Sequence, residues 1–146
     1  MQTVAMMRTR TAIAAASLLA VTGLSASPAQ ADQLSRGQQQ VDTFFSQYLT
    51  SVTGQNQDAT PVDVRNEYLT AQLNQQLDQY QQTFDADPVF RSQNVPVSWS
   101  TQYGGSGAGH TTVILTENWG SGQSTQIWYQ VDLSDLVIDG LQAQPS

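Results

Sequence analysis

The chain has 146 residues, with 12 acidic and 5 basic side chains and a formal charge of −7 at pH 7. Such a charge repels phosphate backbones and anionic lipid surfaces, so we expect neither nucleic-acid binding nor binding to a membrane surface. The sequence contains no cysteine and one histidine, which excludes disulfides and makes a transition-metal site improbable. We therefore predict no metal and no cofactor, and stability that depends on packing alone.

The first 31 residues have the three parts of a secretory signal peptide. Arg8 and Arg10 are the charges of the first ten residues, an apolar stretch follows, and Ala29-Gln30-Ala31 is a small-x-small cleavage pattern. The apolar run is interrupted by Thr, Ser and Gly and is too short for a transmembrane anchor. We predict cleavage after Ala31 and a secreted (extracellular) protein. Residues 32–146, with three arginines against twelve acids, suit a single domain.

Residues 34–52 predict a long amphipathic helix. Its apolar side chains recur at offsets of 0, 3, 4, 7, 8 and 11 residues, which places them on one face. These side chains are Val41, Phe44, Phe45, Tyr48, Leu49 and Val52.

Two shorter helices are predicted next. Thr60 has the properties of an N-cap, followed by Pro61 at the first helical position and an acid, Asp63, in the first turn. Thr70 is the expected N-cap of the next helix, in which leucines recur within the Gln-rich tract "QLNQQLDQYQQ". Because the tract follows helical periodicity, we interpret its glutamines as an exposed helix face rather than an aggregation-prone segment.

The segment Asp85–Pro96, "DADPVFRSQNVP", joins the helices to the strands that follow. Its close carboxylates are of a type that binds calcium, but the Gly and Glu of a calcium loop are missing. We favour the interpretation that Asp85 ends the preceding helix and that Asp87-Pro88 begins a turn. Arg91 either binds a carboxylate ligand or ties its own loop to local acids and carbonyls, and we favour the second.

After Pro96 the apolar period becomes two, which predicts β-strands. Val95, Val97, Trp99, Thr101 and Tyr103 alternate with polar neighbours, and Gly104–Gly109 is the expected flexible hairpin connection. The further strands are predicted at His110–Trp119, Thr125–Leu133 and Leu136–Leu141. The expected fold class is α+β, with N-terminal helices packed on one face of a four-stranded antiparallel meander.

The order of elements and several phrases resemble the nuclear transport factor 2-like (cystatin-like) superfamily, and within it small exported bacterial domains of unknown function. The phrases are "VDTFFSQYLTSV", "YLTAQLNQQL", "DADPVFRSQNVP" and "YQVDLSDLVIDGLQ". The resemblance implies a curved sheet wrapped on a long helix, forming a cone with an apolar pocket. It also implies that a homodimer is possible. Members include cyclase-like and isomerase-like enzymes and non-catalytic binding modules, so the fold does not decide the function.

The candidate contact residues are aromatic. Trp99, Tyr103, Trp119 and Trp128 lie on successive predicted strands, where they serve as core, as cross-strand pairs or as a binding surface. His110 follows the Gly-rich hairpin, and seven residues separate it from Glu117, so the two side chains should point to opposite faces. We predict no catalytic residue at His110.

Two functions remain open at this point. The favoured hypothesis is a secreted, non-catalytic binding domain for a small apolar ligand or a protein partner. The alternative is a cyclase- or isomerase-like enzyme with a buried carboxylate as general base, for which Glu117 and Asp132 are the strand acids to inspect. A carboxylate that lies on the inner face of the sheet is the observation that the alternative requires.

Overall fold

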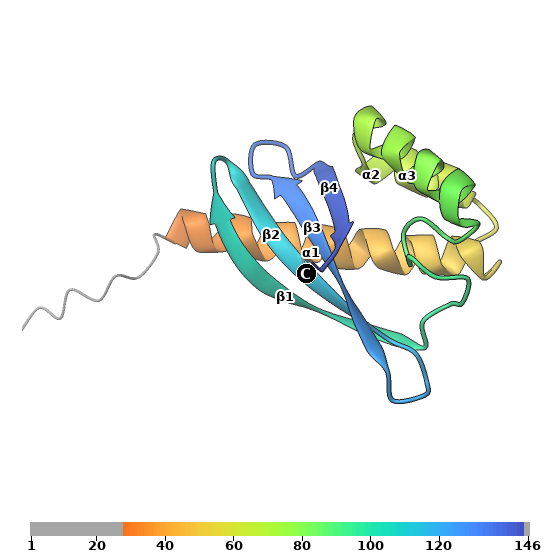
Figure 1. Cartoon of the computed structure of the whole chain (residues 1–146). Coiled ribbons are helices and arrows are strands. Elements are labelled where there is room, and N and C mark those ends of the chain that lie inside the picture. Colours follow the sequence, from red (N-terminus) through yellow and green to blue (C-terminus); the bar gives the residue numbers. More distant parts are fainter. Residues whose placement is uncertain (1–27, 145–146) are drawn as a thin grey trace, which may run out of the picture.

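The structure is a computed structural model that describes residues 28–144 (Figure 1). Three helices come first: α1 (Pro28–Val52), α2 (Pro61–Tyr68) and α3 (Ala71–Phe84). The strands β1 (Ser98–Gly107), β2 (His110–Asn118), β3 (Ser124–Asp132) and β4 (Ile138–Ala143) follow and form one antiparallel sheet in the order β1-β2-β3-β4. The predicted α+β class and the meander are confirmed. None of the helices in this part of the chain has the length and apolarity that a bilayer crossing requires.

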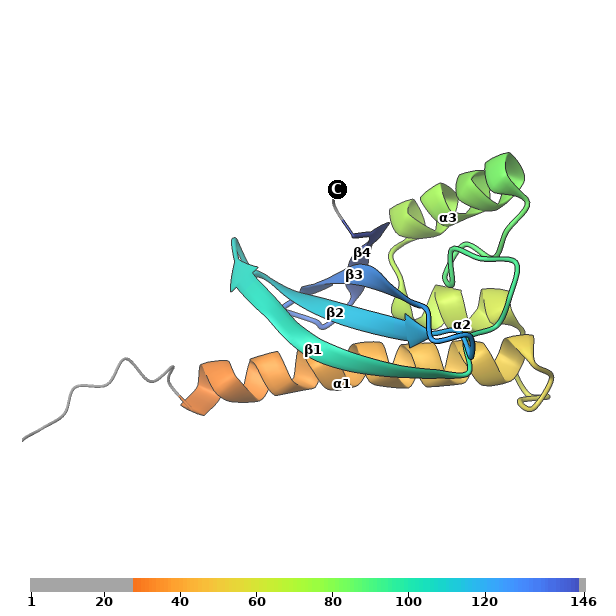
Figure 2. The ribbon, with the colours of Figure 1, turned by 60° about the horizontal axis from the view of Figure 1, so that its bottom comes forward.

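Helix α1 runs along one face of the sheet, which we call the helix face (Figure 2). The predicted apolar stripe is confirmed, because Val41, Phe44 and Phe45 are completely buried. The helix begins at Pro28, so the predicted cleavage site after Ala31 falls in its first turn. Residues 1–27 of the predicted signal peptide lie outside the described residues.

The helix signals of the middle segment are confirmed. Thr60 and Asp63 form a reciprocal capping box at the start of α2, and Thr70 caps α3. Asp85 ends α3 in the left-handed conformation, with φ at 49°. The glutamines at positions 72, 75, 76, 79, 81 and 82 are all exposed, as expected of a solvated helix face.

Helices α2 and α3 are attached to the edge of the sheet at β4. Leu69, between the two helices, pairs with Ile138 in a parallel bridge, and the amide of Thr70 donates to the carbonyl of Ile138 (3.0 Å). Arg65 joins α2 to α3: it is only 4 % exposed and donates to Asn74 and to Asp78. Of the two helices, α2 packs against α1 and α3 against the edge strand β4.

The two faces of the sheet alternate as the sequence predicts. Odd-numbered residues of β2 and β3 point to the helix face, and all but Thr125 are buried; the buried ones are Thr111, Val113, Leu115, Glu117, Ile127, Tyr129 and Val131. Even-numbered residues, including Trp128, point to the opposite face, which we call the outer face. One member of the buried set, Glu117, carries a carboxyl group.

Several boundaries differ from the sequence prediction. β1 begins at Ser98, and Val95 and Val97 before it are exposed, although the amide of Val97 still donates to the carbonyl of Asn118 (2.9 Å). The Gly-rich connection is mostly strand: β1 continues to Gly107 through a bulge after Tyr103, and only Ala108 and Gly109 form the turn. Both turn residues have positive φ, as a tight two-residue hairpin requires.

The last strand is also shorter at its start than predicted. Leu136 adopts a left-handed conformation, with φ at 64°, which ends extended structure there. β4 consequently begins at Ile138 instead of Leu136.

Candidate functional site

A cleft of about 1110 Å³ lies where the loop between α3 and β1 faces the β2–β3 turn and the end of β4. Its volume is slightly above the range of roughly 300–1,000 Å³ that is typical of small-molecule sites. Two buried side chains, Phe90 and Ile127, form its apolar base. Tyr80, Arg91 and Trp119 contribute larger side chains, and Thr125 adds a hydroxyl group. Most of the other lining residues are polar, so the cleft combines aromatic surface with many polar groups.

The loop that forms one side of the cleft is organised by Asp87. Its Oδ1 accepts the amides of Val89 and Phe90, both at 2.9 Å, and its Oδ2 accepts the hydroxyl of Tyr48 at 2.8 Å. Its amide donates to the carbonyl of Ser92 (2.9 Å). The predicted turn at Asp87-Pro88 is confirmed, and the carboxylate that resembled a calcium ligand is occupied by the fold itself.

Arg91 is held by carbonyl and aromatic groups and not by an acid. Its Nη2 donates to the carbonyl of Leu141 on β4 (3.0 Å), and its guanidinium carbon lies 4.0 Å from the centre of the Tyr80 ring. The favoured interpretation of Arg91 as a loop tether is supported in part, since the partners come from β4 and α3 instead of the loop's own acids. Its φ of 55° is unusual for a residue with a side chain.

A chain of hydrogen bonds leads from the cleft into the core. The indole Nε1 of Trp119 donates to the hydroxyl of Thr125 (2.9 Å), which donates to Oε2 of Glu117 (3.0 Å). Glu117 is 0 % exposed and lies behind Thr125 on the helix face. Its other oxygen, Oε1, is buried and has no hydrogen-bond partner among the described residues.

Burial changes the ionisation of this interior group. Desolvation raises the pKa of Glu117 to about 8, with a further increase from the charge of Asp87 and an opposing effect of the Thr125 hydroxyl. The carboxyl group is therefore mostly protonated at pH 7. Nearby, burial raises the pKa of Tyr129 far above its usual value, and the Tyr129 hydroxyl is also without a described partner. Two neutral polar groups thus lie in the core beside the cleft.

The four aromatic residues that the sequence singled out do not converge on one site. Trp119 lines the cleft. Trp99 is partly buried on the helix face, with its ring centre 5.3 Å from that of Phe45. Tyr103 is 50 % exposed on the long hairpin, and Trp128 lies on the outer face, paired with Ile114.

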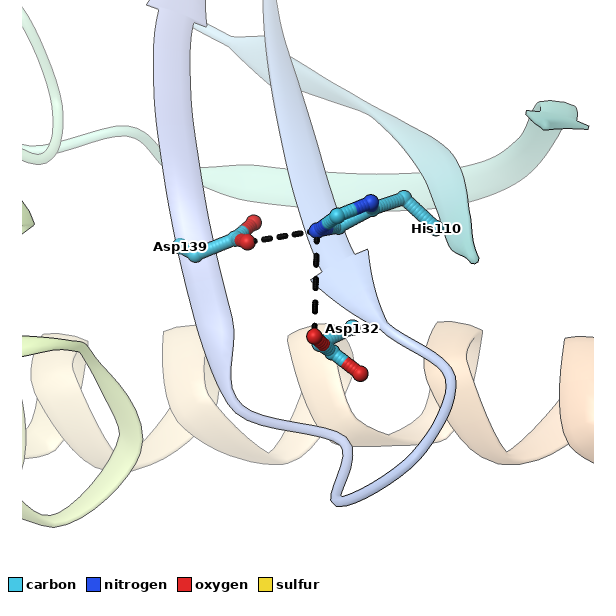
Figure 3. A group of neighbouring side chains, drawn as sticks. All are labelled: His110, Asp132 and Asp139. Atoms are coloured by element: carbon cyan, nitrogen blue, oxygen red, sulfur yellow. Dashed lines mark hydrogen bonds and ion pairs between the residues drawn. The ribbon is translucent and has the colours of Figure 1, made fainter. Parts of the chain in front are cut away.

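His110 lies on the outer face beside two carboxylates, at the end of the sheet formed by the β1–β2 and β3–β4 turns (Figure 3). Its Nε2 lies 2.6 Å from Oδ2 of Asp139 and 3.9 Å from Oδ2 of Asp132. Its Nδ1–H donates to the carbonyl of Ala108 (3.1 Å). The Asp139 hydrogen bond raises the pKa of His110, as does the hydrogen bond to Ala108. Glu117 is on the opposite face, as predicted.

This histidine and its two aspartates are also the described residues that could ligate a metal, since their ligand atoms lie within 4.8 Å of one another. The geometry fits an ion pair better. Two ligands of a tetrahedral zinc ion at 2.0–2.1 Å are about 3.4 Å apart, whereas Nε2 of His110 and Oδ2 of Asp139 are 2.6 Å apart. Both ring nitrogens face acceptors, which favours the protonated imidazolium. We therefore assign the cluster a structural role.

Sequence reasoning identified Trp119, named Glu117 as an acid to inspect and weighed Arg91 as a carboxylate binder without favouring it, but it did not place Thr125 in a site. The alternation of β2 already puts Glu117 on the face of Val113 and Leu115, so the interior acid could have been found from the pattern. Arg91 could not, because its neighbours come from α3 and β4. Comparison with family models, with curated proteins and with solved structures finds no match to this chain.

Proposed function

We propose that the chain is an exported protein that binds a small, largely apolar ligand in this cleft without transforming it. The observation that carries the proposal is the combination of cleft volume and lining. Tyr80, Val95 and Trp119 offer apolar surface to the body of a small molecule, and the more numerous polar residues of the lining offer groups that can fix its orientation. The predicted signal peptide supports export.

The arrangement of elements agrees with a nuclear transport factor 2-like cone, in which a sheet and a long helix enclose an apolar pocket. We place the mouth of that cone at the cleft. A small molecule suits this position better than a protein partner, because the apolar base, Phe90 and Ile127, is buried and is reached only from within the cleft.

One observation favours a second candidate, an enzyme that uses Glu117 as a general acid or base. A buried carboxyl group with a pKa of about 8 beside a cleft is typical of such residues. Against it, Glu117 is 0 % exposed and separated from the cleft by Thr125, so a substrate would reach it only after Thr125 moved. Binding without catalysis is the function that requires no such rearrangement.

The test uses native mass spectrometry on the protein purified from its own source. We expect a bound small molecule of a few hundred daltons. The matched pair of variants is Trp119→Ala, in the cleft, and Trp128→Ala, on the outer face. The first should lose the bound mass and the second should keep it. The cleft is rejected as a binding site if the purified protein never carries a bound molecule, or if both variants lose the bound molecule equally.

The same preparation separates the two candidates. Glu117→Gln keeps the shape of the side chain and removes its proton chemistry. A binding protein should retain its bound molecule unchanged in this variant. If the wild-type protein chemically converts the released molecule and Glu117→Gln does not, the protein is an enzyme instead.

A further inference from the structure

The cleft contains a cation that no acid neutralises. Arg36 and Arg65 are the other arginines after the predicted cleavage site; Arg36 is exposed on α1, and Arg65 pairs with Asp78 at 2.7 Å. Within residues 28–144, no carboxylate oxygen lies within 4.0 Å of the Arg91 guanidinium. The nearest acid along the loop, Asp87, has its oxygens occupied by Tyr48 and by backbone amides. Arg91 therefore keeps its charge available.

The donors of Arg91 are largely unused. A guanidinium group has five N–H donors, and the described residues accept one of them, through the carbonyl of Leu141. Its Nε is buried and has no partner in this part of the chain. A partly buried cation with free donors favours an anionic group, and guanidinium and carboxylate match in a planar, two-bond geometry.

The position of Arg91 is fixed before any ligand arrives. The guanidinium is stacked on Tyr80 and tied to β4, so little side-chain entropy remains to be lost on binding. The backbone of Arg91 is left-handed, a strained conformation for a residue with a side chain. This conformation directs Arg91 between α3 and β4, where it lines the cleft.

The rest of the lining defines the body of the ligand. Tyr80, Val95 and Trp119 offer aromatic and aliphatic surface in the same cleft as the guanidinium. The overall negative charge of the chain repels anions at long range, so selective uptake of an acid depends on this local cation. Resting on the proposed binding function, we infer that the ligand is a small aromatic or aliphatic carboxylic acid whose carboxylate pairs with Arg91.

The experiment compares two probes of nearly equal shape, 2-naphthoate and 2-naphthamide, by calorimetry and by amide chemical shifts of the full mature protein at pH 7. We expect the acid to bind at least tenfold more tightly than the amide, with shifts at Phe90, Arg91 and Trp119. Because this comparison uses the wild-type protein alone, it does not depend on how any variant folds.

The variant test is Arg91→Met, with Arg36→Met as the control that removes the same charge from an exposed site on α1. Arg91→Met should weaken naphthoate at least tenfold and leave naphthamide unchanged, and Arg36→Met should alter neither. Equal binding of both probes to the wild-type protein would overturn the carboxylate inference while the proposed binding function stands. Absence of binding by both probes would overturn the two together.

Discussion

Nε2 of His110 on β2 lies 2.6 Å from Oδ2 of Asp139 on β4, so a charged hydrogen bond spans the strand between them. Asp132, at the end of that middle strand, lies 3.9 Å from the same nitrogen. Its own Oδ1 accepts the amide and the hydroxyl of Ser134, which stabilises the β3–β4 turn. One imidazolium thus connects three strands at one end of the sheet.

The first prediction concerns the titration of His110. The pKa should lie above 6.5, and Asp139→Asn should lower it more than Asp132→Asn, because the hydrogen bond to Asp139 is the largest cause of the shift. Since the folded pKa is raised, the pair stabilises the fold fully below about pH 6.5 and loses this contribution as the pH rises through the folded pKa. Proton NMR of the single imidazole measures the pKa of His110 directly. If the pKa of His110 were the same in Asp139→Asn as in the wild-type protein, the assigned role of the Asp139 hydrogen bond would be wrong.

The second prediction concerns the interior acid. The unfolded carboxyl group of Glu117 ionises near 4.5, whereas the folded one keeps its proton to about 8. The folded state therefore binds more protons between these values, and stability must fall as the pH rises through this window. Glu117→Gln should remove that part of the slope and, by pH 9, stabilise the protein by roughly 3–5 kcal/mol.

Urea unfolding of both proteins at pH 5, 7 and 9 measures this effect. The two curves should nearly coincide at pH 5 and diverge as the pH increases. The matched variant Thr125→Val removes the hydroxyl that lowers the pKa of Glu117. The stability of this variant should therefore continue to fall up to a higher pH than that of the wild-type protein. Parallel stability curves for wild type and Glu117→Gln would show that the carboxyl group is not desolvated.

The third prediction concerns the junction of α2 and α3. Arg65→Ala should destabilise the fold by about 2–4 kcal/mol, because it removes three hydrogen bonds from a buried guanidinium. Asp78→Asn removes only the acid partner, whose side chain is 58 % exposed, and should cost less than about 1 kcal/mol. Thermal or urea unfolding compares the two. Equal losses would mean that the ion pair, and not the contact with Asn74, holds the helices together.

The fourth prediction concerns the approach of α1 to the sheet. A methyl group on Gly37 would lie 2.7 Å from Cγ2 of Thr111, which is fully buried on β2. Alanine normally stabilises a helix interior by about 1 kcal/mol relative to glycine. Here Gly37→Ala should instead destabilise by about 1–3 kcal/mol through overpacking. The double variant with Thr111→Ser removes the clashing methyl and should recover part of the loss in the same unfolding assay.

Local signals predicted the helices well, because their determinants are neighbours in sequence. Thr60, Asp63 and Thr70 cap helices through residues three positions away, and the stripe of α1 depends on its own periodicity. The start of β1 was misplaced because Val95 and Val97 continue the apolar alternation, although both side chains are exposed and β1 begins only at Ser98. The tight turn at Ala108-Gly109 was missed because its register depends on the pairing of β1 with β2.

The candidate site was less accessible to sequence reasoning. Arg91 meets Tyr80 and Leu141, which are 11 and 50 positions away, and no local pattern connects them. Sequence reasoning separated His110 from Glu117 but did not connect it with Asp139, because Asp139 reaches it only after β3 and β4 have paired. Aromatic residues were identified by type, but only the fold separates Trp119 in the cleft from Trp128 on the outer face.

The two ends of the chain have different relations to the cleft. α1 begins beside the β1–β2 hairpin, at the far end of the molecule, whereas Ala143 of β4 lines the cleft itself (Figure 1). An affinity tag or a solid support joined ahead of Asp32, the first residue after the predicted cleavage site, would be attached at the end of the chain that is remote from the cleft. The same tag placed after Ser146 would follow Ala143, which lines the cleft, by only a few residues. Immobilised protein for ligand discovery should therefore be attached through its amino-terminal end.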